Sequence, residues 1–170
     1  ETLAAVHREY LSAGAQLITA NTFRTTAFSV ENTGISNAEQ TARRWLFESV
    51  KLAKKCAAEF ADTRFVAGSL APLADCYRPQ ETPADAILRR EHQRTAAWLC
   101  EAGCDAILVE TQGCGREARL AVAAAVIESA GKLPVLLSLL PDSTATRLLD
   151  GDELLRCALD CRDRGACAVL

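Results

Sequence analysis

The sequence predicts an α/β fold with a parallel β-sheet, and three observations carry this prediction. Short apolar segments of strand length alternate along the chain with longer segments of helical periodicity. The apolar segments are continuous, as in residues 106–109 (Ala-Ile-Leu-Val) and 135–137 (Val-Leu-Leu), which is typical of strands buried on both faces of a parallel sheet. Three helix-to-strand junctions share a glycine, at Gly14, Gly103 and Gly165, which predicts helix ends directly before buried strands.

The first two units follow from periodicity and from one glycine. Apolar residues recur at helical spacing within residues 2–13, and Gly14 is expected to end this helix. The short apolar segment 16–21 then predicts the first strand. A helix within residues 37–60 and a strand at 65–69 form the second unit.

The remaining units repeat the same alternation of helix and strand. Glycines close the predicted helices, and Pro134 opens one of the strands. In order, we expect a helix over about 83–102, a strand at 106–110, a helix over about 116–130, a strand at 135–139, a helix over about 152–164 and a strand at 166–170.

Two architectures accommodate such a chain: a doubly wound sheet of about five strands, or an eight-stranded (β/α)8 barrel of the TIM type. The doubly wound fold lacks its usual signature, since no G-x-G-x-x-G follows a predicted strand. A complete barrel needs about 250 residues. The 170 residues start on a helix and stop within a strand, so we expect one partial barrel domain over residues 1–170, with about five of eight units and without the first strand and the last units.

Composition narrows the class of protein. The formal net charge is −3 and the basic residues are scattered, so we expect no nucleic-acid partner. The longest apolar stretches, residues 121–127 and 133–140, fall short of the roughly 20 residues that span a bilayer, and no leader opens the chain. We therefore expect a cytoplasmic protein.

The eight cysteines are expected to be reduced thiols rather than a disulfide scaffold. Cys157 and Cys161 share one helical face, but zinc needs four ligands, so a buried core role is favoured for both. Cys76 and Cys114 lie in loops after strands and are the expected exposed thiols.

Polar residues at the carboxyl ends of the predicted strands are the candidate site residues, because sites of parallel β/α folds form there. Glu110 is expected to point into the barrel mouth, where a carboxylate can bind an ammonium group or a metal, or act as a base. Its structural alternative is pairing with an arginine or with backbone amides. Asn21 and Thr22 can hydrogen-bond a polar ligand or start a turn, and Gly68 with Ser69 can offer amide donors to an anion.

Seven short segments carry a pattern that extends over nearly the whole chain. They are residues 7–11 (His-Arg-Glu-Tyr-Leu), 13–15 (Ala-Gly-Ala), 18–23 (Ile-Thr-Ala-Asn-Thr-Phe), 67–73 (Ala-Gly-Ser-Leu-Ala-Pro-Leu), 77–79 (Tyr-Arg-Pro), 102–105 (Ala-Gly-Cys-Asp) and 110–111 (Glu-Thr). In this order they resemble the homocysteine S-methyltransferase family, whose homocysteine-binding domain is a zinc-containing β/α barrel.

The resemblance implies a role for each candidate residue. Glu110 would bind the amino group of homocysteine, and Thr111 would support it. Asn21 and Thr22 would line the pocket, and the loop at Gly68 and Ser69 would help to hold the substrate. In the family, zinc binds the substrate sulfur as a thiolate, which attacks an activated methyl group. The Tyr-Arg-Pro segment is similar to free-standing enzymes that use sulfonium donors such as S-methylmethionine.

The sequence also departs from the family pattern. The family's zinc cysteines come from an Asn-Cys after the sixth strand and from a later Gly-Gly-Cys-Cys, and neither motif occurs in residues 1–170. The resemblance therefore implies zinc ligands beyond Leu170 in a longer parent, no metal ligand in this chain, and a fragment that is inactive alone. Ala20 and Ala71 replace residues that are usual in the family, Thr in the first case and Gly or Pro in the second.

Three functions remain open at this point. The first is a homocysteine S-methyltransferase that forms methionine. The second is a barrel lyase or aldolase with Glu110 as general base, which would need a lysine or metal ligand at another strand end. The third is a non-catalytic barrel that binds a small molecule.

Overall fold

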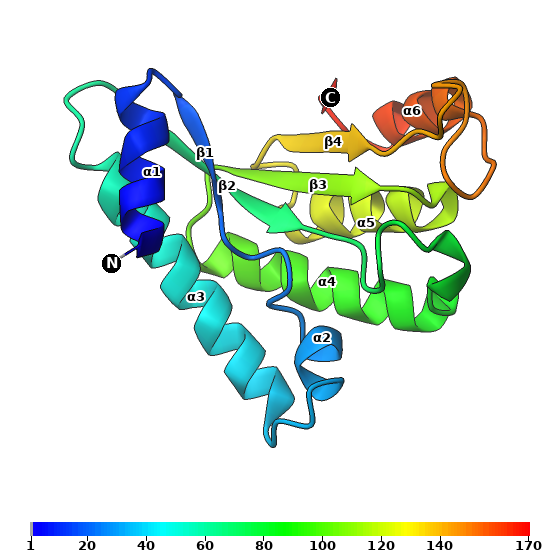
Figure 1. The fold of residues 1–170 in the computed structure, drawn as a ribbon, viewed down its shortest axis with the longest axis horizontal. Helices are drawn as coiled ribbons and strands as arrows, with labels where there is room; N and C mark the ends of the chain where they lie inside the picture. The colour runs from blue at the N-terminus through cyan, green and yellow to red at the C-terminus, as the bar shows by residue number, and fades with distance from the viewer. Residues whose placement is uncertain (1) are drawn as a thin grey trace.

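A computed structural model describes residues 2–170 and contains one parallel sheet flanked by helices (Figure 1). Its strands are β1 (Leu17–Ala20), β2 (Phe65–Leu70), β3 (Ala106–Gln112), β4 (Val135–Leu139) and β5 (Ala168–Val169). Its helices are α1 (Thr2–Ser12), α2 (Ala27–Glu31), α3 (Ala38–Ala57), α4 (Asp85–Glu101), α5 (Gly115–Glu128) and α6 (Leu154–Asp163), with a 3-10 turn η1 (Pro79–Glu81). No helix within residues 2–170 is long and apolar enough to cross a bilayer.

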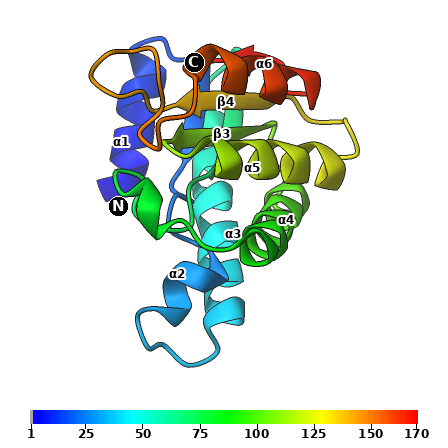
Figure 2. The same ribbon diagram turned by 90° about the vertical axis from the view of Figure 1, so that its right-hand side faces the viewer.

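The strands lie in the sheet in the order in which they occur in the sequence, β1-β2-β3-β4-β5, and every neighbouring pair is parallel. A doubly wound sheet reverses its strand order and carries helices on both faces, whereas consecutive right-handed crossovers keep all helices on one face. Helices α3, α4, α5 and α6 pack against the strands on one face (Figure 2). The expected α/β fold with a parallel sheet is confirmed. The sheet is open, with β1 and β5 as its edges.

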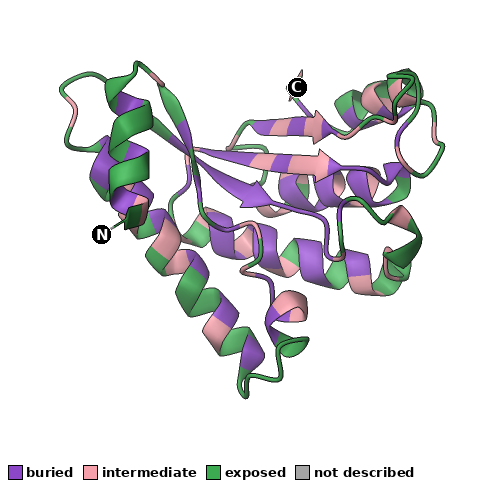
Figure 3. Ribbon diagram, viewed as in Figure 1, coloured by how far each residue is buried: buried purple, intermediate pink, exposed green. Residues whose placement is uncertain are grey.

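The two faces of the sheet differ in burial, and buried and half-buried residues alternate along β4 in Figure 3. Ile18, Ile107 and Leu137 point toward the helices and are at most 5% exposed. Side chains of a strand alternate between the faces, and the register pairs Leu17 with Phe65 on the other face, where they are 41% and 47% exposed. Polar residues on this accessible face are open to a ligand.

The predicted boundaries of helices and strands lie close to the observed ones, and the three glycines predicted to end helices do so. Gly14, Gly103 and Gly165 have φ angles of 104°, 82° and 112°, a region that glycine adopts without steric cost. The sequence prediction misses the short elements α2 and η1. Helix α2 follows Thr26, whose Oγ1 accepts a hydrogen bond from Ser29 N at 3.0 Å, but five residues are too few to display helical periodicity.

Candidate substrate-binding site

Glu110 lies near the carboxyl end of β3, and its carboxylate receives no hydrogen bond from the described part of the chain. The side chain is half-buried. The side-chain hydrogen bond made to this residue runs from Gln112 Nε2 to the backbone oxygen of Glu110, at 3.4 Å. Within residues 2–170, therefore, neither an arginine nor a backbone amide neutralises the carboxylate. It is available to a cation or a donor that a ligand brings.

The backbone bulges directly after Glu110. The pairing of β3 with β4 shifts in register between Val109 and Gln112, so Glu110 and Thr111 have no regular partners on β4. Thr111 has a φ of 59°, which is unusual for a β-branched residue. Bulges near sites re-aim side chains, so the conformation of Thr111 sets the direction of Glu110 through the backbone.

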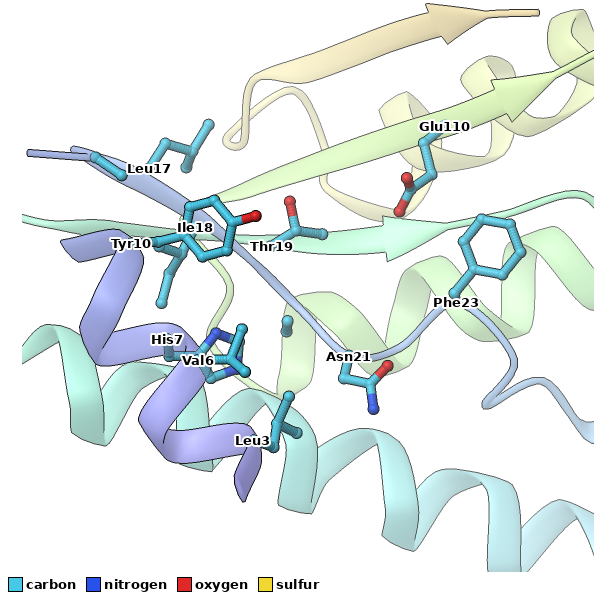
Figure 4. A pocket seen from close by; sticks show the side chains of 12 residues that line it. Leu3, Val6, His7, Tyr10, Leu17, Ile18, Thr19, Asn21, Phe23 and Glu110 are labelled. Atoms are coloured by element: carbon cyan, nitrogen blue, oxygen red, sulfur yellow. The ribbon is translucent and has the colours of Figure 1, made fainter. Parts of the chain in front are cut away.

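A cavity of about 540 Å³ lies between β1, α1 and Glu110. In Figure 4 the carboxylate of Glu110 points from β3 into this space, and Asn21 and Phe23 line it from the segment after β1. Asn21 is exposed, and within residues 2–170 its amide makes no hydrogen bond. The cavity thus brings together a carboxylate, a free amide and an aromatic ring, which suits a small molecule with one ammonium group and an apolar part.

Thr19 is a lining residue that sequence reasoning missed. It alternates along β1 with the buried Ile18 and Ala20, so its hydroxyl faces the cavity (Figure 4). The signal was present as a period of two from Leu17 through Thr19 to Asn21, but a four-residue strand in a continuous apolar segment hides it.

Thr22 and Ser69 join the carboxyl ends of β1 and β2. Thr22 Oγ1 donates to Ser69 O at 3.0 Å and accepts from Ser69 N at 2.9 Å, and both residues are buried. Thr22 does not line the cavity, and the amide of Ser69 is not free for an anion. Ser69 retains its own Oγ, which is buried and has no partner within residues 2–170.

Gly68 is required by packing against helix α4. A Cβ at this position would lie 2.5 Å from Leu99 Cδ2 and 2.8 Å from Cys104 Sγ. The missing side chain therefore faces the helix layer rather than the cavity. Gly68 affects the site through the close approach of β2 to α4.

The loop after Ser69 is held from two further sides. Leu73 N donates to Glu117 Oε1 at 2.9 Å, and the same oxygen lies 3.0 Å from His92 Nε2. Glu117 and His92 are at most 1% exposed. Arg24 Nη1 also donates to Ala74 O at 2.9 Å. Helices α4 and α5 thereby fix the loop that follows β2.

His7 lines the same cavity from α1. It is 5% exposed, and its Nε2 has no hydrogen-bond partner within residues 2–170. Burial lowers the pKa of His7, because desolvation disfavours the charged imidazolium. Burial therefore favours the neutral imidazole. The helical position of His7 in the sequence gave no sign of this placement.

The cysteine predictions are partly wrong. Cys76 and Cys114 are 9% and 7% exposed rather than accessible, because their loops pack together and Gly113 lies so close that a Cβ there would be 2.8 Å from Cys76 O. Cys157 and Cys161 are fully buried, as expected. All eight cysteines are free thiols, and Cys167 is exposed.

A metal site is not found among the described residues. Within residues 2–170 no group of three or more His, Cys, Asp or Glu side chains could hold an ion. A zinc site uses three or four such ligands. These residues therefore do not fit the zinc that the family resemblance implies.

Comparison with known proteins decides the family. A model of the family described as homocysteine S-methyltransferase matches residues 1–170. The chain belongs to the homocysteine S-methyltransferase family. The resemblance drawn from the seven segments is thereby confirmed.

Solved structures of a homocysteine methyltransferase, MmuM from Escherichia coli, share the fold. The metallated form matches with a TM-score of 0.82 at 27% identity, and the oxidized form with 0.81 at 25%; each match covers 98% of this chain and 60% of that chain. The apo form matches with a TM-score of 0.75 at 22% identity, covering 98% and 58%, which supports the fold alone. The chain thus spans about 60% of the length of these homocysteine methyltransferases.

Proposed function

We propose that residues 1–170 form the homocysteine-binding part of a homocysteine S-methyltransferase, and that Glu110 binds the ammonium group of homocysteine. The observation that carries the proposal is the half-buried carboxylate of Glu110, which points into a cavity and has no donor within residues 2–170. A charge-assisted hydrogen bond from an ammonium group would satisfy it. Membership of the family supports the identity of the substrate.

The other candidate residues divide by what they contact. We assign Asn21 to a polar contact with the substrate, because it lines the cavity and its amide has no hydrogen-bond partner within residues 2–170. Ser69 is buried and does not line the cavity, so we assign it to positioning through its backbone bonds to Thr22. We assign Thr22, Gly68 and Thr111 to positioning, because they hold the strand ends and the bulge that carry the contact residues. Positioning of this kind matters because a misplacement of about 1 Å can cost a hundredfold in rate.

The proposed reaction transfers a methyl group between two sulfur atoms. The thiol of homocysteine loses its proton to solvent, and the thiolate attacks the methyl carbon of a sulfonium donor such as S-methylmethionine. The new carbon–sulfur bond forms as the old one breaks, and the donor sulfur keeps the electron pair. Both products are methionine. The Tyr-Arg-Pro segment at residues 77–79 supports the sulfonium donor.

We assign no step of this reaction to a metal held by this chain. The zinc of the proposed complete enzyme would be held by residues outside 1–170, and the complete barrel would comprise units beyond the five described here. Residues 2–170 supply the binding, orientation and shielding of the substrate. We also propose a cytoplasmic location, which the eight free thiols support.

A lyase or aldolase would find no partner lysine at a strand end within residues 2–170. A Schiff-base mechanism needs a lysine at a strand end, but the chain has Lys51, Lys54 and Lys55 on α3 and Lys132 in the turn that precedes β4. A non-catalytic binding barrel remains the second candidate, because it would use the same free carboxylate. The two candidates differ in whether the bound thiol is methylated.

The test is methyl transfer from S-methylmethionine that carries a deuterated methyl group. With homocysteine that carries ¹³C, a protein that joins this chain to the proposed zinc-binding units is expected to give methionine that carries both the ¹³C and the deuterated methyl group, which mass spectrometry separates from the methionine left by the donor. The 170-residue chain alone is expected to give none. Homocysteine binding without label transfer by the zinc-loaded protein would support the binding barrel, and carbon–sulfur cleavage would support a lyase.

A further inference from the structure

A second depression lies on the outer surface of the helix layer, away from Glu110. It is formed by α4, α5 and α6, which lie side by side in Figure 2, and its volume is about 480 Å³. We call it the arginine groove. Its lining contains five arginines, namely Arg89, Arg116, Arg119, Arg156 and Arg164, together with Asp85, Asp152, Asp160, Leu120 and Ala123.

Two of these arginines are already neutralised. Arg119 contacts Asp152 at 2.5 Å and Asp160 at 2.8 Å, and its side chain is only 18% exposed. Arg116 contacts Asp85 at 2.5 Å. These ion pairs connect the three helices and form a fixed floor for the groove, on which Leu120 adds an apolar part.

The other three arginines have no carboxylate partner within residues 2–170. Arg89 lines the groove from α4, and Arg156 and Arg164 line it from α6 and the residue that follows this helix. All three are exposed. Five arginines against three aspartates leave the lining with two positive charges, although the chain as a whole carries −3. The arginine groove is therefore positively charged, although the net charge of the chain is negative.

The chemistry of this lining selects an anion with more than one charge. A guanidinium group is a rigid planar donor that matches phosphate oxygens in pairs. Guanidinium groups on both sides of a groove can hold a group of two or more phosphates between them. The volume falls in the range of roughly 300–1,000 Å³ that is usual for small-molecule sites.

We propose that the arginine groove binds a small molecule through a diphosphate group. This site is separate from the proposed homocysteine site and does not depend on methyl transfer. None of the residues that line the groove is aromatic, so a nucleobase would gain no stacking. The diphosphate itself supplies the recognition, and inorganic pyrophosphate and adenosine diphosphate bind with similar affinity.

The test is calorimetric titration of the 170-residue chain with sodium pyrophosphate and, separately, with adenosine diphosphate, at constant ionic strength. One saturable site is expected. The substitutions Arg89→Gln, Arg156→Gln and Arg164→Gln are each expected to weaken binding roughly three- to tenfold, as the loss of one partly screened charge-assisted hydrogen bond does.

Arg44→Gln is the matched control, because Arg44 is an exposed arginine on α3 with no carboxylate partner within residues 2–170. It is expected to leave binding unchanged. Tighter binding of adenosine diphosphate that still requires the three groove arginines would support the site and identify a nucleotide as its source. Non-saturable binding, or equal weakening by Arg44→Gln and the groove variants, would overturn the proposal. Thermal shifts with pyrophosphate provide a second readout with the same expected pattern.

Discussion

Thr22 Oγ1 exchanges two hydrogen bonds with the backbone of Ser69, accepting from its N–H at 2.9 Å and donating to its carbonyl at 3.0 Å. These two hydrogen bonds join the carboxyl end of β1 to the carboxyl end of β2. Because both residues are buried, no water replaces either bond if the hydroxyl is lost.

Thr22→Val is therefore expected to destabilise the fold by about 1–3 kcal/mol, since valine has the same shape but leaves Ser69 N and O unpaired. Urea unfolding followed by circular dichroism measures the change. Thr63→Val is the control, because Thr63 is exposed and its hydroxyl makes no hydrogen bond within residues 2–170. Equal stability of the two variants would show that the Thr22 bonds contribute nothing.

Gly68→Ala tests whether this glycine is required by packing. A Cβ would lie 2.5 Å from Leu99 Cδ2, and overpacking of this kind costs about 1–3 kcal/mol. The double variant Gly68→Ala with Leu99→Ala is expected to be less destabilised than the sum of the single variants, because the new methyl enters the space that leucine leaves. Additive free energies of unfolding would contradict the contact.

Glu117 is expected to be needed for the loop after β2. Glu117→Ala leaves Leu73 N and His92 without their buried partner and is expected to cost about 3 kcal/mol or more. Glu117→Gln keeps an acceptor oxygen for Leu73 N and is expected to cost less. Free energies of unfolding in urea rank the two variants. Equal losses in the two variants would mean that the charge on Glu117, which both remove, holds the loop rather than the hydrogen bond to Leu73.

The lowered pKa of His7 predicts a pH dependence of stability. The folded state binds the proton more weakly than the unfolded chain, whose histidine pKa is about 6.5. Stability is therefore full above pH 6.5 and falls as the pH drops through that value toward the folded-state pKa. His7→Gln is expected to remove part of the loss, measured as the difference between urea midpoints at pH 7.5 and pH 5. An unchanged difference would rule out His7 as a source.

The repeating units of the fold could be predicted from sequence because each rests on local signals. Continuous apolar segments such as 106–109 identify buried parallel strands, and glycines such as Gly103, with a φ of 82°, mark the helix ends. Helix α2 was not predicted, because a capping threonine, Thr26, is the main sequence signal for a helix of five residues. The bulge at Thr111 escaped because a β-branched residue gives no sequence signal for a positive φ.

The site could be predicted only where a residue follows directly from the strand that carries it. The position of Glu110 near the end of β3 was predicted in this way, since its place at the end of an apolar segment is visible in the sequence. Glu117 on α5 pairs with His92 on α4, and no local sequence pattern predicts a contact between these two helices. The burial of Cys76 and Cys114 likewise depends on two loops that meet only in the folded chain.

The central claim is that Glu110 recognises the ammonium group of homocysteine. The most direct measurement compares kcat/KM for homocysteine and for 4-mercaptobutanoate, which lacks the amino group, in the zinc-loaded protein that contains this chain. The wild-type protein is expected to prefer homocysteine by about 10- to 100-fold, as one charge-assisted hydrogen bond allows. Glu110→Gln is expected to abolish the preference without changing kcat/KM for 4-mercaptobutanoate, and Glu31→Gln, on the exposed end of α2, is expected to change neither. Equal loss with both thiols in Glu110→Gln would contradict the account and indicate a general base or a structural role.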